Sequence, residues 1–249
     1  FHQAQHDADL RHRMRLDYAM RQALASNRLR LKYQPQVDLI SGEVVGAEAL
    51  IRWRDPELGE VSPGEFIPVA EETGFIVAIG DWVLSQAAGQ CARWRARGLM
   101  LPVSINVSAL QFRRPDFVDR VAAVLAEHRL PGPVLELELT ESILVHDVDE
   151  VLERLSRLAA LGVRLAVDDF GTGYSSLAYL KRFPIDRLKI DRSFVKGLPS
   201  DDSDAAIVRA IIQLARALGL NAIAEGVETV SQHSFLAQAG CDAYQGFLY

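Results

Sequence analysis

Two adjacent carboxylates end an apolar run, and a loop with two glycines follows, in the stretch Arg164-Leu165-Ala166-Val167-Asp168-Asp169-Phe170-Gly171-Thr172-Gly173-Tyr174-Ser175-Ser176. Side chains alternate between the faces of a strand, so neighbouring aspartates cannot both stay on one face of a continuous strand. We therefore expect the strand to end near Asp168. Two like charges this close raise the cost of ionising both, and a bound cation is a common remedy. The alternative is a polar turn in which an aspartate caps the next helix.

The rest of the chain alternates between short apolar runs and longer segments with helical periodicity. Strands at 29–38 and 44–53 are separated by Ser41-Gly42, a turn signal that predicts an antiparallel hairpin. Further strands are expected at 102–108, 134–139, 163–167, 187–190, 222–224 and 242–247. Helices are expected at 8–27, 64–72, 76–97, 115–129, 147–161, 175–182, 204–218 and 228–239.

This order of elements predicts an α/β protein with a parallel sheet, because strands that alternate with helices form βαβ units. Eight strands in about 220 residues favour closure into a (β/α)₈ barrel of the TIM type, here with an antiparallel first strand. An open doubly wound sheet is the alternative, but the chain lacks the glycine fingerprint that such sheets carry for nucleotides. The sequence has no internal repeat or Pro/Ser-rich linker, so we expect one domain.

The composition narrows the range of partners and compartments. The formal net charge is −6, whereas proteins that bind nucleic-acid polymers are more often basic. Cys91 and Cys241 lie far apart and form no ligand-type pair, which suits a reducing compartment. No apolar run approaches the ~18 residues that span a bilayer, and no signal peptide is visible, so we expect a cytoplasmic domain. Because the chain opens on Phe1 without an initiator methionine, we interpret it as part of a longer protein, which could carry a membrane anchor or a sensor.

Polar residues stand at or near the carboxyl end of seven of the eight expected strands. They are Glu48, Asn106, Glu138, Asp168, Asp169, Lys189, Glu225 and Gln245, with Arg52 and Glu141 a few residues further on. In a parallel barrel these ends meet on one face, where active sites of this fold lie. A single buried acid is often structural, but four strands that each deliver carboxylates to one rim favour a functional site.

The ligand types indicate the chemistry. Oxygen donors without histidine or cysteine select hard cations such as Mg²⁺ or Mn²⁺. The carboxylates and the asparagine of this set are sufficient for two ions, and paired metals are the usual apparatus for in-line displacement at phosphorus. Lys189 would add a point charge for a phosphate or a water, and Arg52 a fork for a phosphate oxygen. The locally basic segment 181–196 fits a phosphate-bearing ligand, although a solvated helix face would explain it as well.

The segment Glu48-Ala49-Leu50 resembles the signature of the EAL domain family, the cyclic di-GMP phosphodiesterases of bacterial signalling. The resemblance runs from about residue 15 to the end of the chain. It includes Tyr33-Gln34-Pro35-Gln36, Phe66-Ile67-Pro68, Ala70-Glu71-Glu72-Thr73-Gly74, Asn106-Val107-Ser108, Glu138-Leu139-Thr140-Glu141, Asp168-Asp169-Phe170-Gly171-Thr172-Gly173-Tyr174-Ser175-Ser176, Leu188-Lys189-Ile190-Asp191 and Ala224-Glu225-Gly226-Val227-Glu228-Thr229. The fold of that family is a (β/α)₈-type barrel with a reversed first strand, which agrees with the expected hairpin.

The resemblance implies hydrolysis of one phosphodiester bond of cyclic di-GMP to linear 5′-pGpG with two Mg²⁺ or Mn²⁺ ions. By the same resemblance the metal ligands would be Glu48, Asn106, Glu138, Asp168, Asp169 and Glu225. Lys189 and Glu225 would position or deprotonate the attacking water, and Gln245 would lie beside it. Gln34 and Arg52 would hold the dinucleotide.

The resemblance also implies an accessory residue and a domain context. Glu141 would anchor the loop that begins at Asp169, with capping of the next helix as the alternative. Residues 1–14 resemble the connector that follows diguanylate cyclase (GGDEF) domains, so we expect a helical connector at 1–14 and the EAL domain at 15–249. Because the chain stops at Tyr249, before the Arg-Pro-type segment usual in the family, we expect a C-terminally truncated domain. A homodimer and an upstream sensor or GGDEF domain are the expected protein partners.

Two other functions are compatible with this fold. Many EAL domains bind the ligand without cutting it, but such receptors typically lack a metal ligand or the glycine loop, and this sequence has both. Carbonyl chemistry with Lys189 as a Schiff-base nucleophile would need a desolvated, neutral lysine. Carboxylates around Lys189 would favour its charged form instead.

Overall fold

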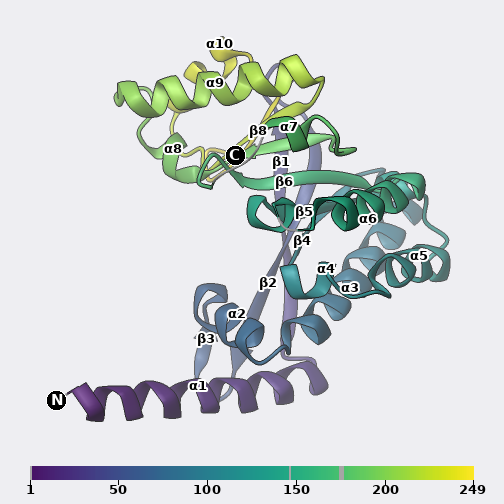
Figure 1. Cartoon of the computed structure of the whole chain (residues 1–249), viewed down its shortest axis with the longest axis vertical. Coiled ribbons are helices and arrows are strands. Elements are labelled where there is room, and N and C mark those ends of the chain that lie inside the picture. The colour runs from purple at the N-terminus through teal and green to yellow at the C-terminus, as the bar shows by residue number, and fades with distance from the viewer. Residues whose placement is uncertain (1, 146, 174–176) are drawn as a thin grey trace.

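The computed structural model describes residues 2–145, 147–173 and 177–249 (Figure 1). Its strands form one sheet in the order β1-β9-β8-β7-β6-β5-β4-β2-β3, and pairing between β1 and β2 closes the first eight of these into a barrel. The strands are β1 (Leu29–Asp38), β2 (Val44–Asp55), β3 (Gly59–Val61), β4 (Val103–Val107), β5 (Leu135–Thr140), β6 (Arg164–Phe170), β7 (Arg187–Ile190), β8 (Asn221–Glu225) and β9 (Ala243–Gln245).

The expected reversal of the first strand is confirmed. β1 is antiparallel to both of its neighbours, β2 and β9, whereas β2 and β4 to β9 run parallel to one another around the barrel. The hairpin turn forms because the Asp38 carboxylate accepts hydrogen bonds from the backbone amides of Ile40 and Ser41, and Gly42 adopts a φ of 70° that favours glycine. The α/β barrel with an antiparallel first strand is therefore the observed fold.

Strand β3 was not expected from the sequence. It pairs with the end of β2, where Trp53 faces Val61 and Asp55 faces Gly59, and it extends β2 two residues beyond the predicted strand. A strand of three residues is too short for its alternation to be recognised.

Helices follow most strands and cover the outside of the barrel. They are α1 (His2–Ala25), α2 (Pro63–Glu72), α3 (Ile76–Ala96), α4 (Ala109–Phe112), α5 (Phe117–Glu127), α6 (Val148–Ala160), α7 (Leu177–Leu180), α8 (Arg192–Lys196), α9 (Asp202–Leu218) and α10 (Val230–Ala239), with 3₁₀ turns at Gly132–Val134 and Glu141–Leu144. The short helices α4 and α8 and the 3₁₀ turns were not predicted. Of the helix expected at 175–182 the structure has α7, while its first expected residues, Ser175 and Ser176, lie outside the described residues.

Figure 1 shows α1 at one end of the molecule, beside α2 and β3, and α9 and α10 at the other end. α1 is continuous across residue 14, and its buried side chains Leu16, Met20 and Ala23 join the core. Upstream of residue 15, Arg13 forms an ion pair of 2.7 Å with Glu72 of α2. The division into a connector at 1–14 and a domain at 15–249 stays a prediction. None of the helices in the described part of the chain is both long and apolar enough to cross a membrane.

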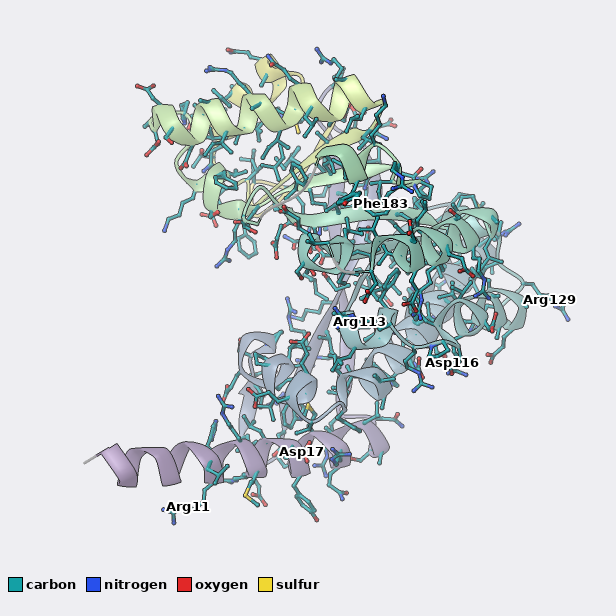
Figure 2. All side chains as sticks on the ribbon, viewed as in Figure 1. Arg11, Asp17, Arg113, Asp116, Arg129 and Phe183 are labelled. Carbon is teal, nitrogen blue, oxygen red and sulfur yellow. The ribbon has the colours of Figure 1, made fainter. Side chains whose placement is uncertain are left out.

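The core lies between the barrel wall and the helices. In β5 the leucines Leu135, Leu137 and Leu139 are fully buried, and the intervening acids Glu136 and Glu138 point to the opposite face, the barrel interior. Burial of both faces explains why this strand alternates between apolar and acidic residues without exposing the acids. Figure 2 shows a charged and an apolar side chain in contrasting positions: Arg129 points outward from the molecule, whereas the buried Phe183 lies among other side chains.

Candidate active site

The carboxyl ends of the barrel strands bring the predicted polar side chains together around Lys189. The Nζ atom of Lys189 lies 2.5 Å from Oε2 of Glu138 and 2.6 Å from Oε1 of Glu225. It lies 3.1 Å from Oδ1 of Asp168 and 3.8 Å from Oε2 of Glu48. These side chains come from β7, β5, β8, β6 and β2, so the common rim predicted for the strand ends is present.

The electrostatics of this cluster keep Lys189 charged. Burial alone would lower the pKa of Lys189, but Glu138 and the other three carboxylates raise it well above its usual value. Burial also raises the pKa of Glu138 well above its usual value, even though Lys189 opposes this effect. A lysine held as an ammonium cannot act as a nucleophile toward a carbonyl, so the geometry argues against Schiff-base chemistry.

Asp168, Asp169 and Glu225 form a compact carboxylate group. One oxygen from each lies within 4.8 Å of the others. Burial, followed by repulsion from Asp168, raises the pKa of Asp169 to about 6. Burial raises the pKa of Glu225 to about 7, although the nearby Lys189 lowers it. Burial and the repulsion from Asp168 thus disfavour the ionised forms of Asp169 and Glu225 in the metal-free site.

The expectation that the strand ends near Asp168 is wrong. β6 continues to Phe170, which pairs with Ile190, and the register shifts between Val167 and Phe170. Asp169 adopts a left-handed conformation with φ of 52°, which departs from the alternation of a regular strand. This irregularity lets two consecutive acids face the site without ending the strand.

Glu48 is held through both of its carboxylate oxygens. The side-chain amide of Asn106 donates to Oε1 of Glu48 at 2.6 Å, and that of Gln245 donates to Oε2 at 2.6 Å. The Gln245 amide also donates to Oε1 of Gln34 at 3.0 Å. With its amide nitrogen directed at Glu48, Asn106 keeps its carbonyl oxygen available for a cation.

Glu141 lies next to the glycine loop, as expected. Its Oε2 accepts hydrogen bonds from the backbone amides of Gly173 at 3.2 Å and Gly171 at 3.4 Å. A Cβ on Gly173 would lie 3.1 Å from the Glu141 carboxyl carbon, so the loop approaches closely because this residue is glycine. The Thr172 hydroxyl donates instead to the carbonyl of Asp169 at 2.8 Å. The residue in the capping position of the following 3₁₀ turn is Thr140, so Glu141 does not fill that position.

The donor set fits hard divalent cations. It consists of carboxylate oxygens and the asparagine amide oxygen, and five carboxylates share one lysine. Oε1 of Glu138 is buried without a hydrogen-bond partner, which is costly unless a ligand satisfies it. The residues present therefore fit the metal ions that the resemblance implies.

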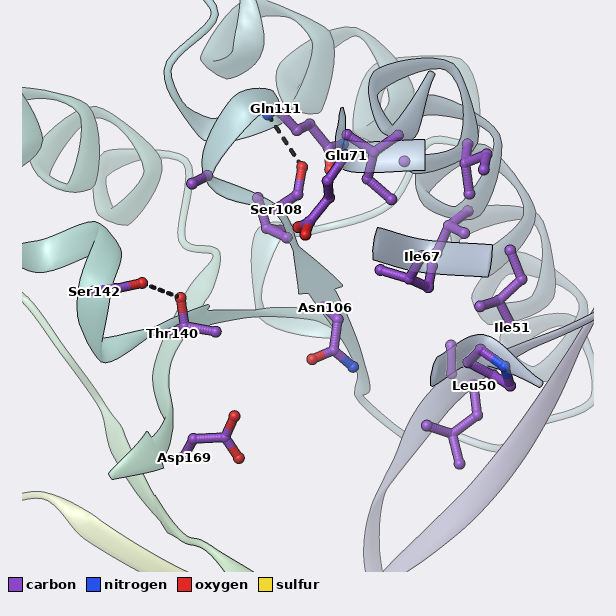
Figure 3. A pocket seen from close by; sticks show the side chains of 18 of the residues that line it. Leu50, Ile51, Ile67, Glu71, Asn106, Ser108, Gln111, Thr140, Ser142 and Asp169 are labelled. Carbon is purple, nitrogen blue, oxygen red and sulfur yellow. Dashed lines mark hydrogen bonds between the residues drawn. The ribbon is translucent and has the colours of Figure 1, made fainter. Parts of the chain in front are cut away.

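A cavity of about 750 Å³ opens beside this cluster (Figure 3). Asn106 and Asp169 lie on its polar side, and Leu50 and Ile67 on its apolar side. Arg52 also lines it, two residues beyond Leu50 on the same face of β2, with Nη1 donating to the carbonyl of Ile51 at 2.8 Å. Gln34 is not among the residues that line this cavity and lies with Gln245 and Glu48 instead.

Several polar residues of the site region were not predicted. Glu71 and Gln111 line the cavity, from α2 and α4. A further group lies deeper in the barrel: Gln36, Ser104, Glu136 and Arg187. Three of these stand two residues before a predicted site residue in the same strand, a spacing that places both on one face and could have identified them.

Comparison with known proteins gives the relationships of this chain. The bifunctional diguanylate cyclase/cyclic di-GMP phosphodiesterase MucR of Pseudomonas aeruginosa is 47% identical over 249 residues, which cover 100% of this chain and 36% of MucR. The cyclic di-GMP phosphodiesterase NbdA of the same species is 44% identical over 237 residues, which cover 95% of this chain and 30% of NbdA. This chain thus spans about a third of the length of these curated relatives.

The same relationship is found among solved structures. A structure described as the PaMucR phosphodiesterase in complex with c-di-GMP has a TM-score of 0.91 and 48% sequence identity, and the match covers 94% of this chain and 95% of that chain. The family model described as EAL domain matches residues 17–249. By the extent of this match, and by the barrel and the acidic rim described above, the chain belongs to the EAL domain family.

Proposed function

We propose that this chain is a cyclic-guanylate-specific phosphodiesterase that hydrolyses one phosphodiester bond of cyclic di-GMP, a bacterial second messenger, to linear 5′-pGpG. The observation that carries the proposal is the set of carboxylates around Lys189 beside a cavity large enough for a dinucleotide. The family and the activities named for MucR and NbdA support the same reaction.

The acidic rim is the metal-binding part of this proposal. We assign six residues of this rim as the ligands of two Mg²⁺ or Mn²⁺ ions: Glu48, Asn106, Glu138, Asp168, Asp169 and Glu225. Bound there, the ions would polarise the scissile phosphate and lower the pKa of the attacking water. The hydrogen bonds that the side-chain amides of Asn106 and Gln245 donate to Glu48 would keep its carboxylate oriented toward the cations.

Lys189 and Glu225 have different roles in the proposed hydrolysis. Lys189 is held as an ammonium, so it can donate hydrogen bonds to the attacking water or to a phosphate oxygen but cannot accept a proton. Glu225 has a pKa of about 7 in the metal-free site and lies 2.6 Å from Lys189, so we assign it as the proton acceptor. The water oxygen bonds to phosphorus and the bond from phosphorus to the 3′ oxygen breaks. The 3′ oxygen leaves with a proton.

The remaining predicted residues would bind and align the substrate. Arg52 lines the cavity and can offer guanidinium donors other than the one that meets the Ile51 carbonyl to a phosphate oxygen. Gln34 and Gln245 would lie along the edge of the dinucleotide next to Glu48. Glu141 would hold the loop after Asp169 and so fix the position of that carboxylate.

Incubation of the purified chain with cyclic di-GMP and Mg²⁺, followed by chromatographic separation, tests the reaction. We expect linear pGpG to accumulate and to be lost when a chelator is added. If cyclic di-GMP binds by equilibrium dialysis but stays intact, the chain is a receptor and the hydrolytic proposal is wrong.

We further infer that the chain acts within a longer protein and as a homodimer. The name of MucR combines cyclase and phosphodiesterase activities, and this chain covers 36% of that protein, so an upstream GGDEF or sensor domain and a cytoplasmic location are part of this proposal. The helices around α7 are the surface that we propose for the dimer. Light scattering that finds only monomers at high concentration, with activity unaffected by dilution, would contradict the dimer.

A further inference from the structure

A second group of polar side chains lies inside the barrel beneath the acidic rim. This lower polar layer consists of Gln36, Ser104, Glu136 and Arg187. The first three are 1–2% exposed, and the Arg187 side chain is 12% exposed. Each lies two residues from a residue of the rim: Gln34 in β1, Asn106 in β4, Glu138 in β5 and Lys189 in β7. Because the strand period is two, both layers occupy the barrel interior, as stacked layers do in this fold.

Arg187 sets the direction of the hydrogen bonds in the lower polar layer. Its Nη1 lies 3.0 Å from Oε1 of Glu136 and 3.0 Å from Oε1 of Gln36. A guanidinium can only donate hydrogen bonds. The side-chain amide of Gln36 must therefore turn its oxygen toward Arg187 and its NH₂ group away.

The NH₂ group of Gln36 connects this layer to the acidic rim. It lies 3.4 Å from Oε1 of Gln245 and 3.3 Å from the Ser104 hydroxyl. Because an NH₂ group can only donate, Gln245 must turn its oxygen toward Gln36. The nitrogen of Gln245 then faces Oε2 of Glu48 at 2.6 Å and Oε1 of Gln34 at 3.0 Å.

We propose that Gln36 is a positioning residue that passes the orientation imposed by Arg187 to the Gln245 amide, which in turn holds Glu48 for metal binding. The proposal depends on the proposed function, in which Glu48 is a metal ligand. A carboxylate that neutralises a cation attracts an amide NH₂ group less strongly than a free carboxylate does. Gln36 would therefore maintain the orientation of Gln245 when cations occupy the site.

The packing around Gln36 leaves its side chain little freedom. It faces Gly46 in the β1–β2 pairing, and a Cβ on Gly46 would lie 2.7 Å from Oε1 of Gln36. A side chain at position 46 would thus displace the oxygen that meets Arg187. An apolar side chain in place of Gln36 could fill the same space, but it could not link Arg187 to Gln245.

The variant Gln36→Glu separates positioning from packing. It keeps the length of the side chain and an acceptor for Arg187, but it replaces the donor that faces Gln245 with a second acceptor. The new carboxylate should then repel the Gln245 oxygen and displace the Gln245 amide from its position against Glu48. We expect kcat to fall by about tenfold or more and Mn²⁺ affinity, measured by electron paramagnetic resonance, to fall by a similar factor.

Two further variants complete the test. Gln36→Met removes both hydrogen bonds and keeps the volume, so it should lose kcat as Gln36→Glu does, and it serves if the glutamate variant does not fold. Ser104→Ala removes the other acceptor of the Gln36 amide and the hydroxyl that donates to Oε1 of Glu136, but it leaves the link to Gln245, so its kcat should stay within about twofold of the parent. Wild-type kcat and Mn²⁺ affinity in Gln36→Glu would overturn the proposal.

A measurement without metal or substrate separates this proposal from the proposed function. The NH₂ resonances of Gln245 in the metal-free protein report which groups its nitrogen meets. They should shift strongly in Gln36→Glu and little in Ser104→Ala. If these resonances shift as expected while the parent does not hydrolyse cyclic di-GMP, the proposed function fails and the link between Gln36 and Gln245 stands. Unshifted resonances in Gln36→Glu would refute the link whether or not the parent is active.

Discussion

The ammonium of Lys189 lies 2.6 Å from the carboxylate of Glu225 at the centre of the acidic rim, and Lys189 is 1% exposed. The same ammonium contacts Glu138 and Asp168. In the metal-free protein it therefore offsets part of the repulsion among the carboxylates. In the proposed reaction it serves as a fixed hydrogen-bond donor. Both roles require a compact charge at this position.

Replacement of Lys189 by methionine should lower both the turnover and the stability of the metal-free protein. We expect turnover of cyclic di-GMP to fall by several orders of magnitude, because the groups of such a site act as a unit. The metal-free variant should also be less stable by about 3–5 kcal/mol, the usual cost of removing one partner of a buried ion pair. Steady-state kinetics and thermal unfolding measure the two effects. The control Lys189→Arg keeps the charge but not the compact shape and should stay largely inactive. Near-normal turnover in Lys189→Met would exclude the assigned role.

The stability of the metal-free domain should fall as the pH rises from about 4 to about 7 and then level off. The pKa of Asp169 is raised to about 6 and that of Glu225 to about 7, from ordinary values of 3.8 and 4.5. A carboxyl whose pKa is higher in the folded state stabilises the protein fully below its unfolded pKa, and this contribution is lost above its folded pKa.

Thermal unfolding between about pH 4 and pH 8, with and without Mg²⁺, measures this dependence. We expect Mg²⁺ to raise the melting temperature more at the higher pH, because cations compete with protons for the carboxylates. In the control variant Glu225→Gln the loss of stability with pH should be smaller. An equal pH dependence in the two proteins would show that Glu225 is not the titrating group.

Catalysis should require Mg²⁺ or Mn²⁺ and be supported poorly by Ca²⁺. The donor set contains oxygens suited to all three ions, but Ca²⁺ adopts longer and looser coordination that disturbs a paired metal geometry. Initial rates with each ion after exhaustive chelation measure the preference. Equal turnover with Ca²⁺, or full turnover in excess chelator, would contradict the two-metal assignment.

Glu141→Ala should fold and bind cyclic di-GMP but lose most turnover. The variant removes the carboxylate that accepts hydrogen bonds from the Gly171 and Gly173 amides, so the loop after Asp169 loses these two contacts. Turnover, cyclic di-GMP binding and Mn²⁺ affinity should be measured beside the control Glu141→Gln, which keeps one acceptor oxygen and should retain more activity. A drop in melting temperature equivalent to ~1 kcal/mol with unchanged turnover would indicate a merely structural contact instead.

The sequence predicted the parts of this structure that depend on local pattern. The alternation in β5 and the helical periodicity of α9 depend on which face is buried, and that information is contained in the residue types. The strand ends then followed from topology, since parallel strands end on one side of the barrel. The acidic rim could therefore be predicted with its members.

Other features depend on contacts between distant segments. The left-handed φ of Asp169 accompanies a shift in the pairing register between β6 and β7, which no local pattern reveals. The direction of the Gln36 amide depends on Arg187, which is 151 residues away in the sequence. The cavity wall includes Gln111 from α4, a helix of four residues that is too short to show a period. Tertiary structure decides each of these.

The central claim is that the acidic rim hydrolyses cyclic di-GMP through bound cations, and one paired measurement tests it most directly. The rate of pGpG formation in Mg²⁺ is compared between the parent chain and Glu48→Ala, with metal content determined for both. We predict that the parent forms pGpG and that Glu48→Ala keeps its fold while metal binding and turnover are lost together, turnover by several orders of magnitude. Near-normal pGpG formation by a folded Glu48→Ala, or none by the metal-loaded parent, would contradict the account.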